Sequence, residues 1–150
     1  MSNRINLFKL EPDAYTAFAG LENYLQNSGL SKTHGELIKI RASQINGCAY
    51  CIDKHTKDAR KAGESEQRIY ALSAWRETPF FSDEERAILA LTEEVTLIQT
   101  QVSDQTYKIA AEILEPIYLA KVIAAISIIN LWNRIGISTG MQPALSSGKD

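Results

Sequence analysis

The sequence predicts an all-α, single-domain helical bundle of about seven helices. The 150 residues include only four prolines and eight glycines, and most of these lie between segments whose apolar residues recur at helical spacing. No segment shows sustained apolar–polar alternation or a hairpin turn pair, so we expect no sheet. A chain of this length fits one domain, residues 1–150, with a core large enough to need no covalent staples.

Start signals and breakers divide the first half of the chain into four helices. Pro12 opens the first, Ser31 and Ser65 cap the second and the fourth, and Gly63 ends the third. We expect these helices to cover residues 12–29, 31–46, 47–62 and 65–75.

Three more helices follow, at about 82–98, 103–114 and 116–138. Residues 82–85, Ser-Asp-Glu-Glu, form a capping box with acidic residues in the first turn. The last helix carries an apolar stretch, 117–132, which we interpret as a buried core helix that is too short and interrupted to span a membrane. Residues 141–150 contain little apolar mass, so we expect a loose tail.

Composition narrows the function classes. The net charge of −2 and the pI of about 5.7 give no electrostatic case for binding nucleic acid or an anionic membrane. The first ten residues lack the apolar core of a signal peptide, so we expect a cytoplasmic location. Two cysteines three residues apart cannot staple a fold, and in a reducing compartment such a pair indicates redox or metal chemistry.

The residues that carry chemistry lie on the second and third expected helices. Cys48, Cys51 and His55 share one face of the third helix. Positions i and i+3 of a helix lie about 5 Å apart, which is inside the disulfide range. The helix dipole favours the thiolate of Cys48, whereas His55, one turn after Cys51, favours Cys51. If a short loop joins the two helices, Glu36 can approach His55 and orient it.

Two thiols beside a base are the minimum set of groups for reducing a peroxide. One sulfur attacks the O–O bond and becomes a sulfenic acid, and the other condenses with it to a disulfide. Lysines and arginines on the same helix add positive potential nearby, namely Lys54, Lys57, Arg60 and Lys61.

A zinc site is the alternative for the same residues. Cys48, Cys51 and His55 supply three ligands, and His34 or Glu36 could be the fourth, although structural zinc sites usually use two separated ligand pairs. Taken alone, Glu36 would be a solvated helix residue, and His34 an exposed first-turn residue.

Other polar and aromatic residues have structural interpretations. Tyr50 and Trp75 are expected to be core or rim aromatics rather than ligand contacts. Asn130, Asn133 and Arg134 lie on an otherwise apolar helix, where they could satisfy a helix end or a subunit contact.

The stretch from Glu36 to His55 resembles the alkylhydroperoxidase D-like core of the carboxymuconolactone decarboxylase superfamily. That pattern has a glutamate, a cysteine twelve residues later, C-x-x-C, and a histidine four residues further on, which here are Glu36, Cys48, Cys51 and His55. Residues 131–134, Leu-Trp-Asn-Arg, resemble the family's tail-helix signature, so the resemblance anchors about residues 30–140. One departure is Tyr50, because some members have a histidine next to the second cysteine.

The resemblance implies an all-helical fold that assembles into trimers or hexamers. It implies a thiol peroxidase without cofactor or metal, whose substrate is a hydroperoxide and whose reductant is a dithiol or a thiol protein. Cys51 would become the sulfenic acid, Cys48 would resolve it, and Glu36 and His55 would relay protons. We side with Cys51 as the attacking sulfur.

Two other function classes remain open. A decarboxylase-like enzyme would use Glu36 and His55 as acid and base on a small lactone or carboxylate, and would keep its activity after both cysteines become serine. A non-enzymatic redox sensor or zinc-binding module would show a disulfide switch or bound zinc without turnover.

Overall fold

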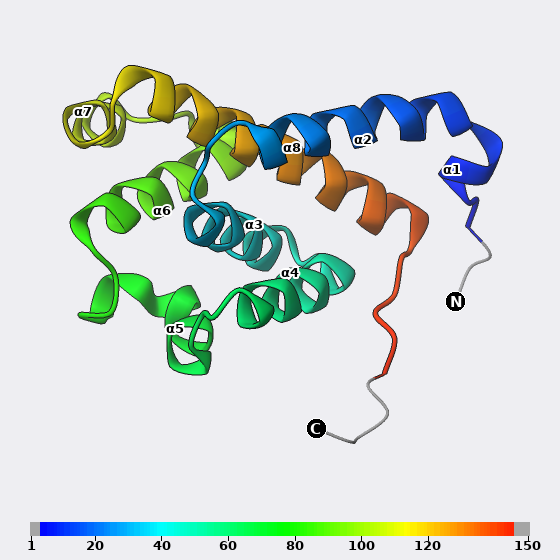
Figure 1. Cartoon of the computed structure of the whole chain (residues 1–150), viewed down its shortest axis with the longest axis horizontal. Coiled ribbons are helices and arrows are strands. Elements are labelled where there is room, and N and C mark those ends of the chain that lie inside the picture. The colour runs from blue at the N-terminus through cyan, green and yellow to red at the C-terminus, as the bar shows by residue number, and fades with distance from the viewer. Residues whose placement is uncertain (1–3, 146–150) are drawn as a thin grey trace.

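The computed structural model describes residues 4–145, whose regular elements are all helices joined by short turns and loops, with no strand (Figure 1). The all-α class predicted from the sequence is therefore confirmed. The elements, in chain order, are α1 (Leu7–Leu10), α2 (Pro12–Asn27), α3 (Lys32–Asn46), α4 (Ala49–Lys61), α5 (Glu66–Ala71), the 3₁₀ helix η1 (Leu72–Glu77), α6 (Asp83–Thr96), the 3₁₀ helix η2 (Ile98–Thr100), α7 (Asp104–Ile113) and α8 (Pro116–Thr139).

The expected start signals act as predicted. Ser31, Ser65, Ser82 and Ser103 each accept a hydrogen bond from a backbone N–H in the first turn of α3, α5, α6 and α7. These bonds satisfy donors that a helix start otherwise leaves unpaired. Helix α1, a single turn capped by the side chain of Asn6, was not expected from the sequence.

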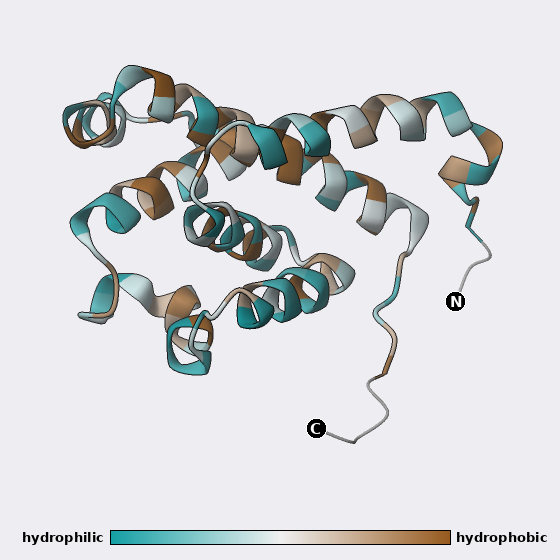
Figure 2. Ribbon diagram, viewed as in Figure 1, coloured by the Kyte–Doolittle hydropathy of each residue, from teal (hydrophilic) through white to brown (hydrophobic). Residues whose placement is uncertain are grey.

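Helix α8 forms the centre of the main core. Its inward residues pack with those of α3, α6 and α7, and Val122, Ala125, Ile126 and Ile129 are almost fully buried. In Figure 2 brown bands recur along α8, whereas α6 alternates between brown and teal. We expected the apolar stretch 117–132 to be too short and interrupted to span a membrane. By length and composition alone, however, the 24-residue helix α8 could cross one. In the fold, 44% of its most apolar window is buried.

A second core lies on the other side of α3. Leu37 and Ile40 of α3 pack there against Ala59 of α4, Leu72 and Trp75 of η1, and neighbouring side chains. This places Trp75 in the core, as expected. Because α3 has a core on two sides, its position relative to α4 and α8 is well fixed, and that position sets the geometry of the cysteines.

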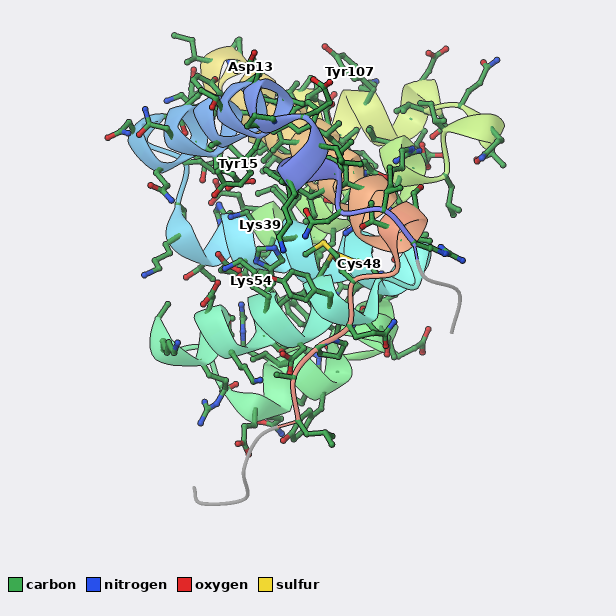
Figure 3. The ribbon with its side chains drawn as sticks, turned by 90° about the vertical axis from the view of Figure 1, so that its right-hand side faces the viewer. Asp13, Tyr15, Lys39, Cys48, Lys54 and Tyr107 are labelled. Carbon is green, nitrogen blue, oxygen red and sulfur yellow. A yellow bond between two sulfur atoms is a disulfide. The ribbon has the colours of Figure 1, made fainter. Side chains whose placement is uncertain are left out.

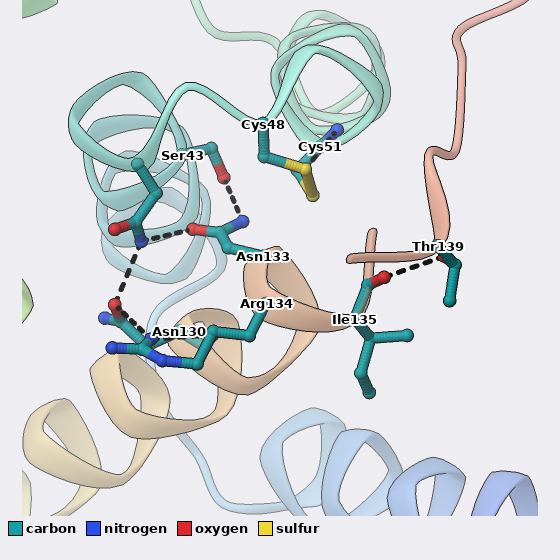
Figure 4. The surroundings of a disulfide bond; sticks show 9 residues. Ser43, Cys48, Cys51, Asn130, Asn133, Arg134, Ile135 and Thr139 are labelled. Carbon is teal, nitrogen blue, oxygen red and sulfur yellow. Dashed lines mark hydrogen bonds between the residues drawn. A yellow bond between two sulfur atoms is a disulfide. The ribbon is translucent and has the colours of Figure 1, made fainter. Parts of the chain in front are cut away.

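Buried polar groups join α8 to the end of α3. The amide nitrogen of Asn46 donates to the side-chain oxygens of Asn130 and Asn133, each at 2.9 Å. Asn133 in turn donates to Ser43 Oγ at 2.9 Å, and Arg134 donates to Asn130 (Figure 4). These bonds run between side chains of α8 and side chains at the end of α3, so the polar residues of α8 have a structural role within the chain.

The expected loose tail is only partly described. Residues 141–145 follow α8 without regular structure, and residues 146–150 lie outside the described part of the chain.

Candidate functional site

A tight corner between α3 and α4 sets the position of the cysteines. Gly47 ends α3 with a φ of 71°, in the left-handed region that glycine adopts at little cost. Cys48 follows at once, and its N–H donates to Ser43 O at 3.0 Å. The short loop required for Glu36 to approach His55 is therefore present.

Cys48 is the N-cap of α4, and Cys51 lies in its first turn. This corrects the expected helix start near residue 47, since Cys48 has extended backbone angles. Its Sγ accepts the N–H of Cys51 at 3.3 Å, so the sulfur lies at the positive end of the helix. The two cysteines form a disulfide, with Cα atoms 5.3 Å apart (Figure 4).

Glu36 and His55 meet across the α3–α4 pair. Nδ1 of His55 lies 3.1 Å from Oε2 of Glu36, and both residues are buried, at 9% and 8% exposed. Lys39 Nζ lies 3.6 Å from the other carboxylate oxygen of Glu36 and 3.7 Å from Glu22 of α2. Glu36 is thus not a solvated helix residue, and His55 keeps Nε2 to exchange a proton on the face of α4 that carries Cys51.

Glycine at position 136 gives the disulfide room on its α8 side. A Cβ at Gly136 would lie 3.3 Å from Cys48 Sγ and 3.7 Å from Cys51 Sγ. Figure 3 views the molecule from the side of Cys48, where the disulfide lies near the end of α8. A cavity of about 400 Å³ opens there, bordered by Cys48, Gly136, Met141 and Arg4 among others. Arg4 also donates to the carbonyls of Ile137 and Ser138 at the end of α8.

The positive charges expected on α4 are largely paired. Lys54 donates to Asp58 at 2.9 Å, and that bond raises the pKa of Lys54. Burial alone would raise the pKa of Asp58, but the Lys54 partner holds it below its usual value. Lys57 forms the equivalent ion pair with Asp53. These carboxylates reduce the positive potential that the sequence suggested near the thiols.

The residues weighed for a zinc site are engaged with other partners: Cys48 and Cys51 form the disulfide, and His55 is bonded to Glu36. Among residues 4–145, no three His, Cys, Asp or Glu side chains are grouped so that they could hold a metal ion. His34 is half-buried rather than exposed, because its Nδ1 lies 2.7 Å from the hydroxyl of Tyr118. Tyr50, between the cysteines, is also half-buried.

Three neighbours of the site were missed from the sequence. Gly136 had a signal, since an isolated glycine inside a helix usually has a packing or functional reason. Lys39, three residues after Glu36, was within reach on the same helix. Arg4 had no signal, because its contact joins the two ends of the chain.

Known proteins are similar to this chain in sequence. The model of the carboxymuconolactone decarboxylase family matches residues 12–94. The uncharacterized protein YdfG of Bacillus subtilis is 45% identical over 96% of this chain and 99% of its own. Alkyl hydroperoxide reductase AhpD of Streptomyces griseus is 40% identical over 60 residues, covering 39% of this chain and 34% of its own length.

A solved structure extends the similarity to the whole fold. ATU0492 of Agrobacterium tumefaciens, a protein of unknown function with a suggested AhpD-type antioxidant role, superposes with a TM-score of 0.93. It is 41% identical, and the match covers 97% of this chain and 100% of that one.

Proposed function

This chain belongs to the carboxymuconolactone decarboxylase family, and from that premise we propose that it is a thiol-dependent peroxidase that reduces hydroperoxides. The observation that carries the proposal is the hydrogen bond between Glu36 and His55. His55 lies one helical turn after Cys51, which forms the disulfide with Cys48. The local similarity to AhpD supports the same chemistry.

The proposed cycle starts from the reduced pair. His55 takes the thiol proton of Cys51, and the thiolate attacks the terminal oxygen of the hydroperoxide. The O–O bond breaks, Cys51 becomes a sulfenic acid, and the alkoxide leaves as an alcohol with the proton from His55. The thiol of Cys48 then displaces water from the sulfenic acid, which forms the disulfide. A thiol reductant of unspecified identity restores both thiols.

The buried position of Glu36 explains how His55 would act as the general base. A carboxylate bonded to Nδ1 fixes the tautomer and orientation of the ring and stabilises the imidazolium that forms when Nε2 takes a proton. Lys39 balances the remaining charge on Glu36. The chain's own residues thus provide nucleophile, base, orienting carboxylate and resolving thiol.

The test is steady-state consumption of an alkyl hydroperoxide with dithiothreitol as donor. We expect the wild-type protein to consume it, Cys51→Ser to lose turnover, and mass spectrometry of the peroxide-treated wild type to show the loss of two hydrogens and no free thiol. A wild-type protein that consumes no peroxide would contradict the proposal. Activity on a small lactone or carboxylate that survives Cys48→Ser and Cys51→Ser together would instead indicate acid–base chemistry.

A further inference from the structure

We propose that the cavity between the start of α4 and the end of α8 binds a small thiol reductant, which attacks Cys48 and releases Cys51 as the thiolate. The inference rests on the dithiol–disulfide cycle of the proposed function. It adds the side from which electrons enter and the residue that keeps this side open.

The cavity borders one sulfur-bearing residue of the pair. Its walls include Gly47, Cys48 and Ala49 at the start of α4, and Gly136, Ile137 and Met141 at the end of α8. Cys51, Glu36 and His55 are not among its lining residues. Glu36 borders a far smaller hollow, of about 10 Å³, between α3 and α4.

A reductant can reach a sulfur only through the cavity, because neither cysteine is open to bulk solvent. Cys48 and Cys51 are only 2% and 4% exposed, so neither sulfur is presented at the surface. The slightly larger value of Cys51 does not place it on the cavity wall. The cavity volume of about 400 Å³ lies in the range of sites that hold small molecules. A thiol fixed to the surface of another protein would have to reach an almost buried sulfur, so the cavity favours a small donor.

The exchange balances in two steps. A thiolate of a small dithiol attacks Cys48 Sγ, a mixed disulfide forms, and the bond to Cys51 breaks with its electron pair on Cys51 Sγ. Protonated His55, one turn further along α4, can supply the proton that this thiolate takes up. The second thiolate of the donor then attacks the donor sulfur of the mixed disulfide, so Cys48 is released and the donor leaves as a cyclic disulfide, two electrons poorer.

Gly136 keeps the approach to Cys48 open. An alanine there would favour the helix itself, since glycine is the weaker helix former. Its Cβ, however, would lie 3.3 Å from Cys48 Sγ, closer than an ordinary carbon–sulfur contact, and on the wall of the cavity. Gly20 of α2 is the matched control, because a Cβ there would meet nothing within 4 Å.

The first experiment measures reduction of the oxidised protein by dithiothreitol, without peroxide. Samples are quenched with acid, free thiols are alkylated, and masses are counted over time. We expect Gly136→Ala to slow reduction about tenfold, since exchange depends on access to the attacked sulfur, and Gly20→Ala to match wild type. Equal rates for wild type and Gly136→Ala, with melting temperatures showing both folded, would overturn the proposal.

The second experiment uses the reverse exchange and does not depend on Gly136. Cys51→Ser leaves Cys48 alone, and Cys48→Ser leaves Cys51 alone. Each is reacted with 5,5′-dithiobis(2-nitrobenzoate) over a range of pH, and rates are extrapolated to the full thiolate. We expect Cys48 to react about tenfold faster, because it borders the cavity. A faster Cys51, or reduction of the wild type by thioredoxin but not by dithiothreitol, would overturn the proposal. Neither experiment contains peroxide, so failure of the peroxidase proposal would be seen separately.

Discussion

Glu36 has a nitrogen partner at each carboxylate oxygen. His55 Nδ1 lies 3.1 Å from Oε2, and Lys39 Nζ lies 3.6 Å from Oε1. A carboxylate that is only 8% exposed needs such partners, because burial removes most of its hydration. The structure thus fixes His55 through Glu36, and the two residues should act as one unit on the thiol of Cys51.

The first prediction concerns this unit. General-base help is worth roughly 10²–10⁴ in rate, so His55→Ala should slow the reaction of the reduced protein with peroxide near pH 7 by about that range. Glu36→Gln should cost a similar factor, and the double variant little more than either alone, because coupled groups are not additive. The losses should shrink above pH of about 8.5, where a free thiol ionises without help. The measurement is the loss of free thiol between pH 6 and 10.

A conservative change on the outer face of α4 serves as the control. Asp53→Asn breaks the exposed ion pair with Lys57 and alters charge on the same helix, yet it should leave the pH profile unchanged. If the losses from Glu36→Gln and His55→Ala multiplied fully, or stayed constant with pH, the two residues would not form a relay.

Between elements, Glu93 of α6 holds α3 and η1 together. Its Oε1 accepts from Arg41 Nε at 2.8 Å and from Trp75 Nε1 at 2.9 Å, and its Oε2 accepts from Arg76. Burial alone would raise the pKa of Glu93, but these three donors together hold it below the ordinary value of 4.5. The ionised form therefore stabilises the fold.

The second prediction follows from that pKa. Glu93→Gln should lower the free energy of unfolding at pH 7 by about 2 kcal/mol, the scale of hydrogen bonds to a charged group. Because the pKa of the folded state is depressed, this contribution is present above about pH 4.5 and is lost as the pH falls through the lower folded-state pKa. Urea unfolding of both proteins at several pH values measures the difference, which should narrow in acid.

The control for Glu93 is an exposed glutamate of α7. Glu112 faces Lys108 at 3.8 Å with both side chains largely in solvent, so Glu112→Gln should change stability little at any pH. A difference between Glu93→Gln and wild type that stayed constant down to pH 3 would contradict the assignment.

Helix boundaries were predictable wherever capping chemistry is local. Serines at four helix starts and Gly47 at a helix end define their boundaries through bonds to neighbours within a few residues. The turn α1 was not predictable in this way, because four residues carry no periodicity. Cys48 was placed inside a helix because the sequence does not show that its sulfur caps one.

The site residues on α4 were predictable from the sequence, whereas the contact with α8 was not. Spacing alone put Cys48, Cys51 and His55 on one face, and a short connection was enough to bring in Glu36. Gly136 is 85 residues or more from both cysteines in sequence, and only the packing of α8 on the α3–α4 corner brings it to the sulfurs. Contacts of that kind depend on tertiary structure, which residue spacing does not encode.

For the whole molecule, the apolar surface left open by the fold is the main feature. Only 44% of the most apolar window of α8 is buried, and Ile117 at its start is 73% exposed. Ile109 and Ile113 of α7, which precedes α8 directly, are exposed as well. A helix that is apolar on most of its circumference usually needs cover on all sides, and a second copy of the chain would supply it.

The last prediction is a homo-oligomer, which the exposed apolar face favours, of at least three copies, as the family resemblance implies. Light scattering at micromolar concentration should give a mass of at least about three times the 16.7 kDa of the chain. Ile117→Glu should shift the distribution toward smaller species, because a charge buried at a subunit contact must lose its hydration. Tyr70→Glu is the matched control: Tyr70 is 74% exposed but lies on α5, away from the α7–α8 junction (Figure 1), so its replacement should leave the mass unchanged. A wild-type mass of 16.7 kDa would show that the exposed face of α8 needs no partner, and equal shifts in both variants would place the contact elsewhere.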